Sequence, residues 1–139
     1  MIKQKYTLYL AAFLFGGVFG WVLDTTFRSL SVGYYTSGTL IPFFSLIFGT
    51  GSVMLYGLFQ YRNISFFLSV IIGTALSVLL ELGGGSVSRM LLNYRLWDYS
   101  ANPFNFYGLI DLEHAFYWFL LSVAYKFSMD HSSGLKSRV

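Results

Sequence analysis

The sequence predicts an all-α membrane protein: a bundle of four transmembrane helices, with a short interfacial amphipathic helix between helices 3 and 4. Composition is the first observation behind this prediction, because 55 % of the residues are apolar and only 11 % are charged, whereas soluble domains carry about 25 % charged residues. The second is that the uncharged runs are long enough for helices that cross the hydrocarbon. With 139 residues, the chain is expected to form a single integral membrane domain, residues 1–139.

The four spans are expected at about residues 6–28, 40–59, 64–82 and 107–127. The first follows two lysines, as in a signal peptide, but its apolar run is longer than usual and no clear cleavage site follows. The second has Pro42 in its first turn, where a missing N–H costs little. Polar, turn-rich segments connect the first three spans.

A run of three glycines, residues 83–85, is expected to break or bend the chain after the third span. Beyond it, Val87, Met90, Leu91 and Tyr94 recur at helical spacing, which predicts a short amphipathic helix at the membrane interface. A loop that contains a proline follows. We therefore assign residues 86–105 to an interfacial helix and a loop.

Basic residues predict the orientation of the chain. Four spans place both termini on one side with six of the nine Lys and Arg residues, and the positive-inside rule assigns that side to the cytoplasm. The six are Lys3, Lys5, Arg62, Lys126, Lys136 and Arg138, against Arg28, Arg89 and Arg95 on the other side. Because these residues are scattered, the net charge of +3 predicts no nucleic-acid partner. The chain has no cysteine, which excludes disulfides and thiolate metal sites.

Acidic residues gather at the opposite ends of the spans. Asp24 lies in the last turn of the first span, Glu81 near the end of the third and Asp111 at the start of the fourth. A charge in the hydrocarbon costs about 2.5–3.5 kcal/mol on insertion scales, so such residues usually face the bundle interior and pair. We expect a shared polar pocket that opens outward. Its candidate residues are Asp24, Arg28, Glu81, Arg89, Trp97, Asp98, Tyr99, Asn105, Asp111, Glu113 and His114.

For two sets of these candidate residues, a purely structural role explains the pattern as well as a pocket does. Asp24 precedes Arg28 by four residues, the favourable order for an ion pair on a helix, and such a pair suits the headgroup zone as well as a pocket. Trp97 and Tyr99 fit an interfacial aromatic belt as well as ligand stacking.

Three kinds of chemistry are compatible with the acidic cluster. Asp111 and His114 share a helix face, and with Glu81 they would be the ligands of a metal ion, but no paired-histidine spacing supports this and we predict no metal or other cofactor. Glu81 or His114 is also a possible general base. No nucleophile–base–orienter pattern accompanies them, so we predict no catalytic residue and leave enzyme activity open. Acids beside glycine-interrupted helices are typical of transporters.

A motif in the segment before the fourth span is shared with a known family. It reads Trp97-Asp98-Tyr99-Ser100, then Pro103-Phe104-Asn105, then Gly108 and Ile110, with Trp118 ten residues past the glycine. It resembles the motif of the bacterial family described as "putative ABC-transporter type IV permeases". Gly20-Trp21 before Asp24, Gly38-x-Leu40-x-Pro42-Phe43, Phe48-Gly49-x-Gly51 and Glu81 are also similar to that family, so the resemblance covers nearly the whole chain.

The resemblance implies a permease-like transport component in the cytoplasmic (plasma) membrane of a bacterium. Since this chain carries no ATPase domain, energised transport would need a separate ATPase subunit, and a homo-oligomer or another membrane subunit is the further partner expected besides the lipid bilayer. The alternatives are a membrane-embedded enzyme acting on lipid or cell-envelope substrates, or a structural or partner subunit of a membrane complex. The family usually has a small residue where Asp111 stands and less polar residues at Glu113 and His114, so these three either form a specialised site or are variable.

Overall fold

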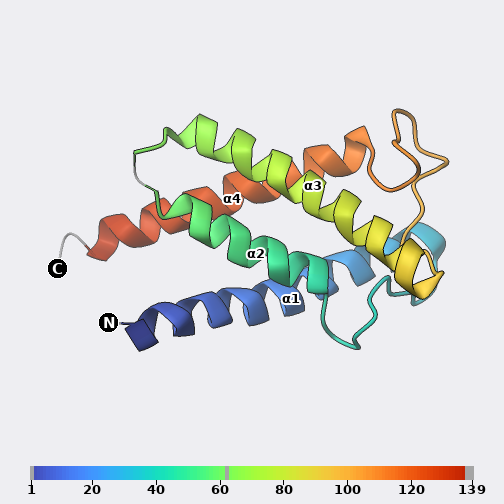
Figure 1. Cartoon of the computed structure of the whole chain (residues 1–139), viewed down its shortest axis with the longest axis horizontal. Helices are drawn as coiled ribbons and strands as arrows, with labels where there is room; N and C mark the ends of the chain where they lie inside the picture. Colours follow the sequence, from blue (N-terminus) through green and yellow to red (C-terminus); the bar gives the residue numbers. More distant parts are fainter. Residues whose placement is uncertain (1, 62, 137–139) are drawn as a thin grey trace.

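The structure is a computed structural model that describes residues 2–61 and 63–136. The described residues form four helices and no strand: α1 (Ile2–Val32), α2 (Leu46–Phe59), α3 (Phe66–Leu92) and α4 (Leu112–Lys136) (Figure 1). The predicted all-helical class is confirmed. Arg62 and Arg138, two of the basic residues behind the predicted orientation, lie outside the described residues.

Among the described residues, two helices are long and apolar enough to cross a membrane: α1 over Tyr6–Val32 and α3 over Phe66–Leu92. The apolar helix α2 has 14 residues, and a helix of that length measures about 21 Å, less than the roughly 30 Å of a hydrocarbon core. α4 has 25 residues but is more polar. Four helices are therefore confirmed, and two of them have the character of membrane spans. That α2 and α4 also cross the membrane stays a prediction.

The start of α2 differs from the prediction. The helix begins at Leu46 and not near residue 40, because the residues before it form a turn in which Phe43 has a positive φ of 63°, a left-handed conformation that a helix cannot continue. Pro42 lies in this turn and not in the first turn of the helix. Ser45 N then donates to Gly17 O at 2.9 Å, which holds the start of α2 against α1.

The glycine run at residues 83–85 does not break α3, which continues through it. The predicted break is wrong because two of these glycines allow close packing instead. A Cβ at Gly84 would lie 2.3 Å from Ile47 Cδ1, and a Cβ at Gly85 would lie 2.6 Å from Leu109 Cδ2. The missing side chains thus allow α2 and the segment before α4 to approach α3 closely.

The predicted interfacial helix is also absent from the described residues. The positions assigned to it are the last part of α3, which ends at Leu92 and is capped by Asn93 in the left-handed conformation (φ 48°). From there the chain runs as a loop to Asp111, so α4 begins at Leu112 and not near residue 107. Because a glycine in a helix costs only about 1 kcal/mol relative to alanine, α3 loses little by continuing through the glycines. A break would instead give up its backbone hydrogen bonds there.

α1 and α2 pack closely through glycines of α1. A Cβ at Gly16 would lie 2.3 Å from Ser52 Cβ, and a Cβ at Gly20 would lie 2.1 Å from Phe48 Cβ. The Gly16-to-Gly20 spacing is the small-xxx-small pattern that brings membrane helices together. Asp24 and Arg28 follow on the next turns, so this packing sets their position relative to α2.

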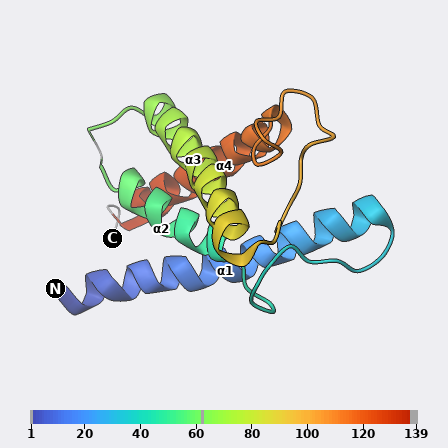
Figure 2. The same ribbon diagram turned by 45° about the vertical axis from the view of Figure 1, so that its right-hand side comes forward.

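The pairing of the other helices leaves one side of the bundle open. α3 packs against both α4 and α2, but no described Cα atom of α1 lies within 8 Å of a Cα atom of α3 or α4. Figure 2 shows α1 running past the end of α2 and apart from α4. Only side chains therefore connect the last turns of α1 to α3 and α4.

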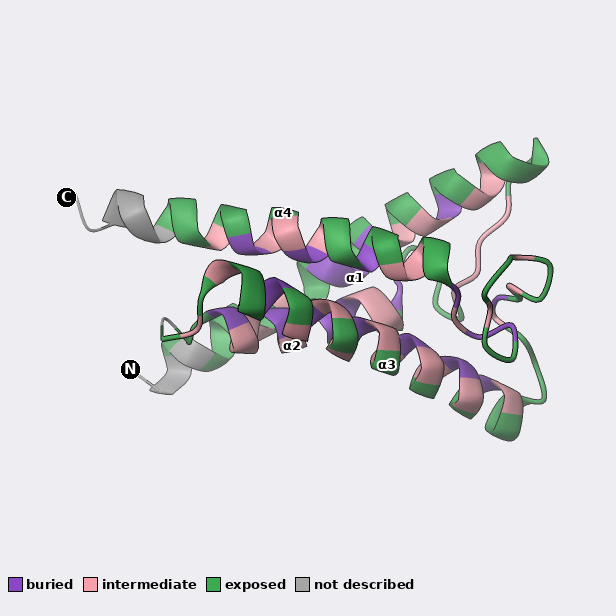
Figure 3. Cartoon of the chain, turned by 90° about the horizontal axis from the view of Figure 1, so that it is seen from above, coloured by how far each residue is buried: buried purple, intermediate pink, exposed green. Residues whose placement is uncertain are grey.

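Burial follows the faces that the helices turn toward one another, above all on α2 and α3, while their outer sides are exposed (Figure 3). Ser69 and Ser77 of α3 and Ser122 of α4 are fully buried, and small residues of this kind are typical of helix contacts in membranes. Large apolar side chains remain exposed outside, for example Phe67 at 78 % and Met90 at 82 %. A soluble protein rarely exposes such a surface, so the fold agrees with the apolar composition.

Candidate functional site

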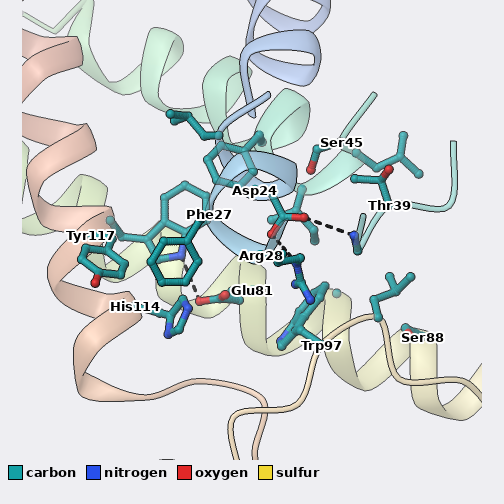
Figure 4. Close-up of a pocket in the computed structure, with 18 of the residues that line it drawn as sticks. Asp24, Phe27, Arg28, Thr39, Ser45, Glu81, Ser88, Trp97, His114 and Tyr117 are labelled. Carbon is teal, nitrogen blue, oxygen red and sulfur yellow. Dashed lines mark hydrogen bonds and ion pairs between the residues drawn. The ribbon is translucent and has the colours of Figure 1, made fainter. Parts of the chain in front are cut away.

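A cavity of about 700 Å³ lies between the last turns of α1, the start of α2, the second half of α3 and the first turns of α4 (Figure 4). It exists because α1 does not contact the backbones of α3 and α4. Its walls are mostly apolar, with polar side chains from every wall. The polar and charged residues among them are Asp24, Arg28, Thr39, Ser45, Glu81, Ser88, Tyr99 and His114.

Glu81 of α3 is the buried carboxylate of this cavity, with 6 % of the residue exposed. Its Oε1 accepts a hydrogen bond from Tyr99 Oη at 2.9 Å, and its Oε2 accepts one from Trp118 Nε1 at 2.9 Å. Burying a carboxylate is costly unless it is hydrogen-bonded, and these two donors supply that stabilisation. No Lys, Arg or His among the described residues forms an ion pair with it.

Asp24 and Arg28 of α1 form the predicted ion pair, with Arg28 Nε donating to Asp24 Oδ1 at 2.8 Å. The other carboxylate oxygen of Asp24 accepts a hydrogen bond from Gly38 N at 3.3 Å. This pair therefore also ties the segment between α1 and α2 to the cavity wall. Both residues line the cavity.

Asp111 and His114 form a second pair at the start of α4. Asp111 Oδ1 accepts from His114 N at 2.7 Å, as an N-capping residue does, and lies 2.8 Å from His114 Nδ1. The imidazole stacks on the ring of Tyr99, with 3.8 Å between ring centroids. Because Tyr99 also donates to Glu81, the Asp111–His114 pair and the buried carboxylate are linked through a single tyrosine.

Aromatic side chains bridge α1 and α4 across the cavity. The ring of Phe27 meets the rings of His114 and Tyr117 edge-on, with centroids 6.2 and 5.8 Å apart. Figure 4 shows these three side chains on the same side of the site as Glu81.

The loop between α3 and α4 is held together by the shared motif. Asp98 accepts hydrogen bonds from Ser100 N at 3.0 Å, from the Ser100 hydroxyl and from Arg95. These bonds, led by those from Ser100, lower the pKa of Asp98 to about 2. Asn105 Oδ1 accepts from Gly108 N at 3.0 Å, where the positive φ of 64° suits glycine.

Two residues of the motif reach from this loop into the cavity. Trp97 is buried against α3, and its Nε1 donates to Leu109 O at 2.8 Å. Tyr99 is fixed by its backbone N–H, which donates to Gly108 O at 2.9 Å, and its hydroxyl reaches Glu81. The motif therefore has two tasks: most of its residues build the loop, and these two deliver aromatic side chains to the site.

Six of the predicted site residues line the cavity and five do not. The six are Asp24, Arg28, Glu81, Trp97, Tyr99 and His114, and the five are Arg89, Asp98, Asn105, Asp111 and Glu113.

The residues outside the cavity wall have other positions. Asp111 lies behind His114, and Glu113 is exposed, accepting a hydrogen bond from Tyr117 at 2.6 Å. Arg89 has two buried guanidinium nitrogens, Nε and Nη2, without a hydrogen-bond partner in the described part of the chain. It is not in the cavity wall and forms no ion pair with a described acid. Within residues 2–61 and 63–136, no three His, Cys, Asp or Glu side chains are placed to hold a metal ion.

Several cavity residues were not predicted from the sequence. Trp118 follows His114 by four residues and Phe27 follows Asp24 by three, so helical spacing alone was a usable signal for both. Ser45 and Phe48 gave no such signal, because they enter the cavity wall only through the packing of α2 on α1.

Comparison with known proteins identifies the family. No curated protein and no solved structure matches this chain. A family model described as "Putative ABC-transporter type IV" matches residues 11–133. This match includes all the residues of the cavity described above. The chain therefore belongs to the "putative ABC-transporter type IV" family.

Proposed function

We propose that this protein is a permease-like component of a transport system in the bacterial cytoplasmic membrane, and that the cavity around Glu81 is its substrate pocket. One observation carries the proposal: Glu81 is buried, forms no ion pair with any described residue and stands in the wall of a cavity of about 700 Å³. Ionisable side chains inside membrane proteins are costly and commonly belong to substrate or ion pathways.

In the membrane, α2 and α4 complete a four-span bundle with α1 and α3. Both termini face the cytoplasm, as the distribution of basic residues predicts, and the cavity opens to the outside. The apolar turn before α2 lengthens that span, and Lys126 near the end of α4 is neutralised by Asp130 at 2.7 Å.

Transport needs two arrangements of the helices around one site. Support for a movable α1 comes from the absence of described backbone contacts to α3 and α4, so that only side chains such as Phe27 bridge the cavity. A shift of α1 against α3 and α4 would open or close the site without disturbing their packing. A separate ATPase subunit would supply the energy, and a second copy or another membrane subunit would complete the pathway.

The test is solute exchange in proteoliposomes, which needs no ATPase because unlabelled solute on one side drives uptake of labelled solute. A panel of labelled amines, amino acids and inorganic cations is applied to the wild type, to Glu81→Gln and to Glu113→Gln. The matched control Glu113→Gln removes an exposed carboxylate outside the cavity wall. We expect exchange by the wild type and by the control, and its loss in Glu81→Gln. Exchange by Glu81→Gln at the wild-type rate would reject the pocket.

The Asp111–His114 pair favours a membrane-embedded enzyme as the second candidate. A carboxylate 2.8 Å from Nδ1 orients a histidine as general bases require, and His114 lines the cavity. Purified protein would then convert a lipid or cell-envelope precursor without any partner, and His114→Gln would stop the turnover. An absence of turnover across such precursors excludes this candidate.

A further inference from the structure

We infer that the ligand of this cavity is a cationic amphiphile, a molecule with an ammonium head and a single aliphatic tail. The inference rests on the proposed function, because it names the class of substrate for the same pocket. Three properties of the cavity lead to it: its charge, the rings around that charge and the character of the remaining wall.

The ionised form of Glu81 gives the cavity a negative charge that no ion pair among the described residues balances. Asp24 is neutralised by Arg28 at 2.8 Å, and Asp111 lies 2.8 Å from His114. The hydrogen-bond donors to Glu81 among the described residues are neutral: the hydroxyl of Tyr99 and the indole N–H of Trp118. With His114 protonated one negative charge remains, and with His114 neutral the site is more negative still. A ligand that completes this site therefore brings a positive charge.

Aromatic rings surround this carboxylate. Tyr99 and Trp118 touch Glu81 directly, and Phe48 packs on Trp118 with ring centroids 4.9 Å apart. Phe27 and Tyr117 complete the wall on the side of α1 and α4. Ring faces attract ammonium groups, and cages of this composition are how proteins recognise quaternary ammonium ligands. The rings therefore favour an organic ammonium over a hydrated metal ion.

The rest of the wall suits an aliphatic tail. Apart from a few small polar side chains, the rest of the lining is apolar and includes Leu40, Leu46, Ile47, Val87, Leu92 and Leu96. The volume of about 700 Å³ falls within the roughly 300–1,000 Å³ of small-molecule sites, so it fits a single-chain ligand better than a two-chain phospholipid.

The tail side of the cavity opens at the surface of the bundle. Leu40, Val87 and Leu92 line the cavity and are still 52, 53 and 50 % exposed. In a membrane this surface lies against lipid, so the tail enters from the bilayer while the ammonium group reaches Glu81. The open side between α1 and the other helices provides that entry.

The test measures binding of dodecyltrimethylammonium to protein in nanodiscs of zwitterionic lipid. Trp97 and Trp118 line the cavity, so tryptophan fluorescence reports occupation, and empty nanodiscs correct for partition into lipid. We expect saturable binding by the wild type and by Glu113→Gln. Glu81→Gln is expected to bind the probe at least about tenfold more weakly, as for the loss of one desolvated charge partner. Dodecanol, which lacks the charge, is expected to bind wild type and Glu81→Gln alike, and dodecyl sulfate is expected not to compete.

A second variant keeps the test decisive if Glu81→Gln does not fold. Val87→Trp fills the tail side at a half-exposed position and leaves the carboxylate in place, so binding of both dodecyltrimethylammonium and dodecanol is expected to fall. Equal binding of the cationic probe by wild type and Glu81→Gln, or equal competition by dodecyl sulfate, would overturn the assignment. Binding of the probe without its exchange in proteoliposomes rejects transport and upholds the ligand class. Exchange of an unrelated solute without binding of the probe upholds transport and rejects the ligand class.

Discussion

Replacing Gly20 by alanine tests the packing that places Asp24 and Arg28 at the cavity. The new Cβ would lie 2.1 Å from both Cβ and Cγ of Phe48. These atoms are the base of the side chain and cannot rotate away, so α1 and α2 must separate. Overpacking of this kind costs about 1–3 kcal/mol, and the upper end applies here because the overlap involves two atoms near the backbone.

The helix propensity of alanine offsets part of this cost. Alanine is about 1 kcal/mol better than glycine in a helix interior, which leaves a net loss of about 2 kcal/mol for Gly20→Ala. For a chain of this size that corresponds to a fall in Tm of roughly 5–10 °C. Gly83→Ala is the matched control, since nothing lies within 4 Å of its new Cβ and only the gain in propensity remains.

Thermal unfolding in detergent micelles, followed by circular dichroism, measures both variants against the wild type. We expect Gly20→Ala to unfold at a lower temperature and Gly83→Ala at the same or a higher one. Two results would refute the reasoning. A Gly20→Ala protein as stable as the wild type would mean that α1 and α2 do not meet at Phe48. A marked loss of stability in Gly83→Ala would mean that α3 is not continuous through its glycines.

Two further predictions concern the residues around the loop. Trp118→Phe keeps an aromatic side chain, though a smaller one, and leaves Glu81 Oε2 without its donor. We expect a loss of about 1–3 kcal/mol from the missing hydrogen bond, seen as a lower Tm in the same micelles, and an unchanged Tm would contradict that hydrogen bond. The pKa of Asp98 is lowered from 3.8 to about 2, so its stabilisation is complete above pH 4 and is lost as the pH falls from about 4 to 2. The protection of the Ser100 amide against hydrogen exchange, measured relative to the intrinsic rate at each pH, is expected to fall over that range. The same fall in Asp98→Asn would show that another group titrates.

Local features of the sequence were sufficient to predict the helical class and two pairs of interacting side chains. Uncharged runs predicted α1 and α3, and helical spacing predicted that Asp24 meets Arg28 and that Asp111 meets His114. Each of these pairs lies within one turn of helix, where the spacing of side chains is set by the backbone alone.

The glycine run in α3 and the start of α2 were not predictable in the same way. Glycine favours a break in an isolated helix, and nothing near residue 84 in the sequence indicates that Ile47 will pack there. Likewise, the left-handed Phe43 that delays the start of α2 belongs to a turn held against α1. In both places a contact with a distant segment overrides the local preference.

The sequence by itself determined that this is an apolar helical protein of its family, with its acids near one end of the helices. Only the tertiary structure decided which of them is left without a basic partner. Glu81 receives its hydrogen bonds from Tyr99 and Trp118, which are 18 and 37 residues away. Local spacing pairs a side chain with neighbours one turn along its own helix, whereas the partners of Glu81 come from a loop and another helix. The cavity likewise exists because the described backbone of α1 approaches α2 but not α3 or α4, and no local pattern in the sequence records that.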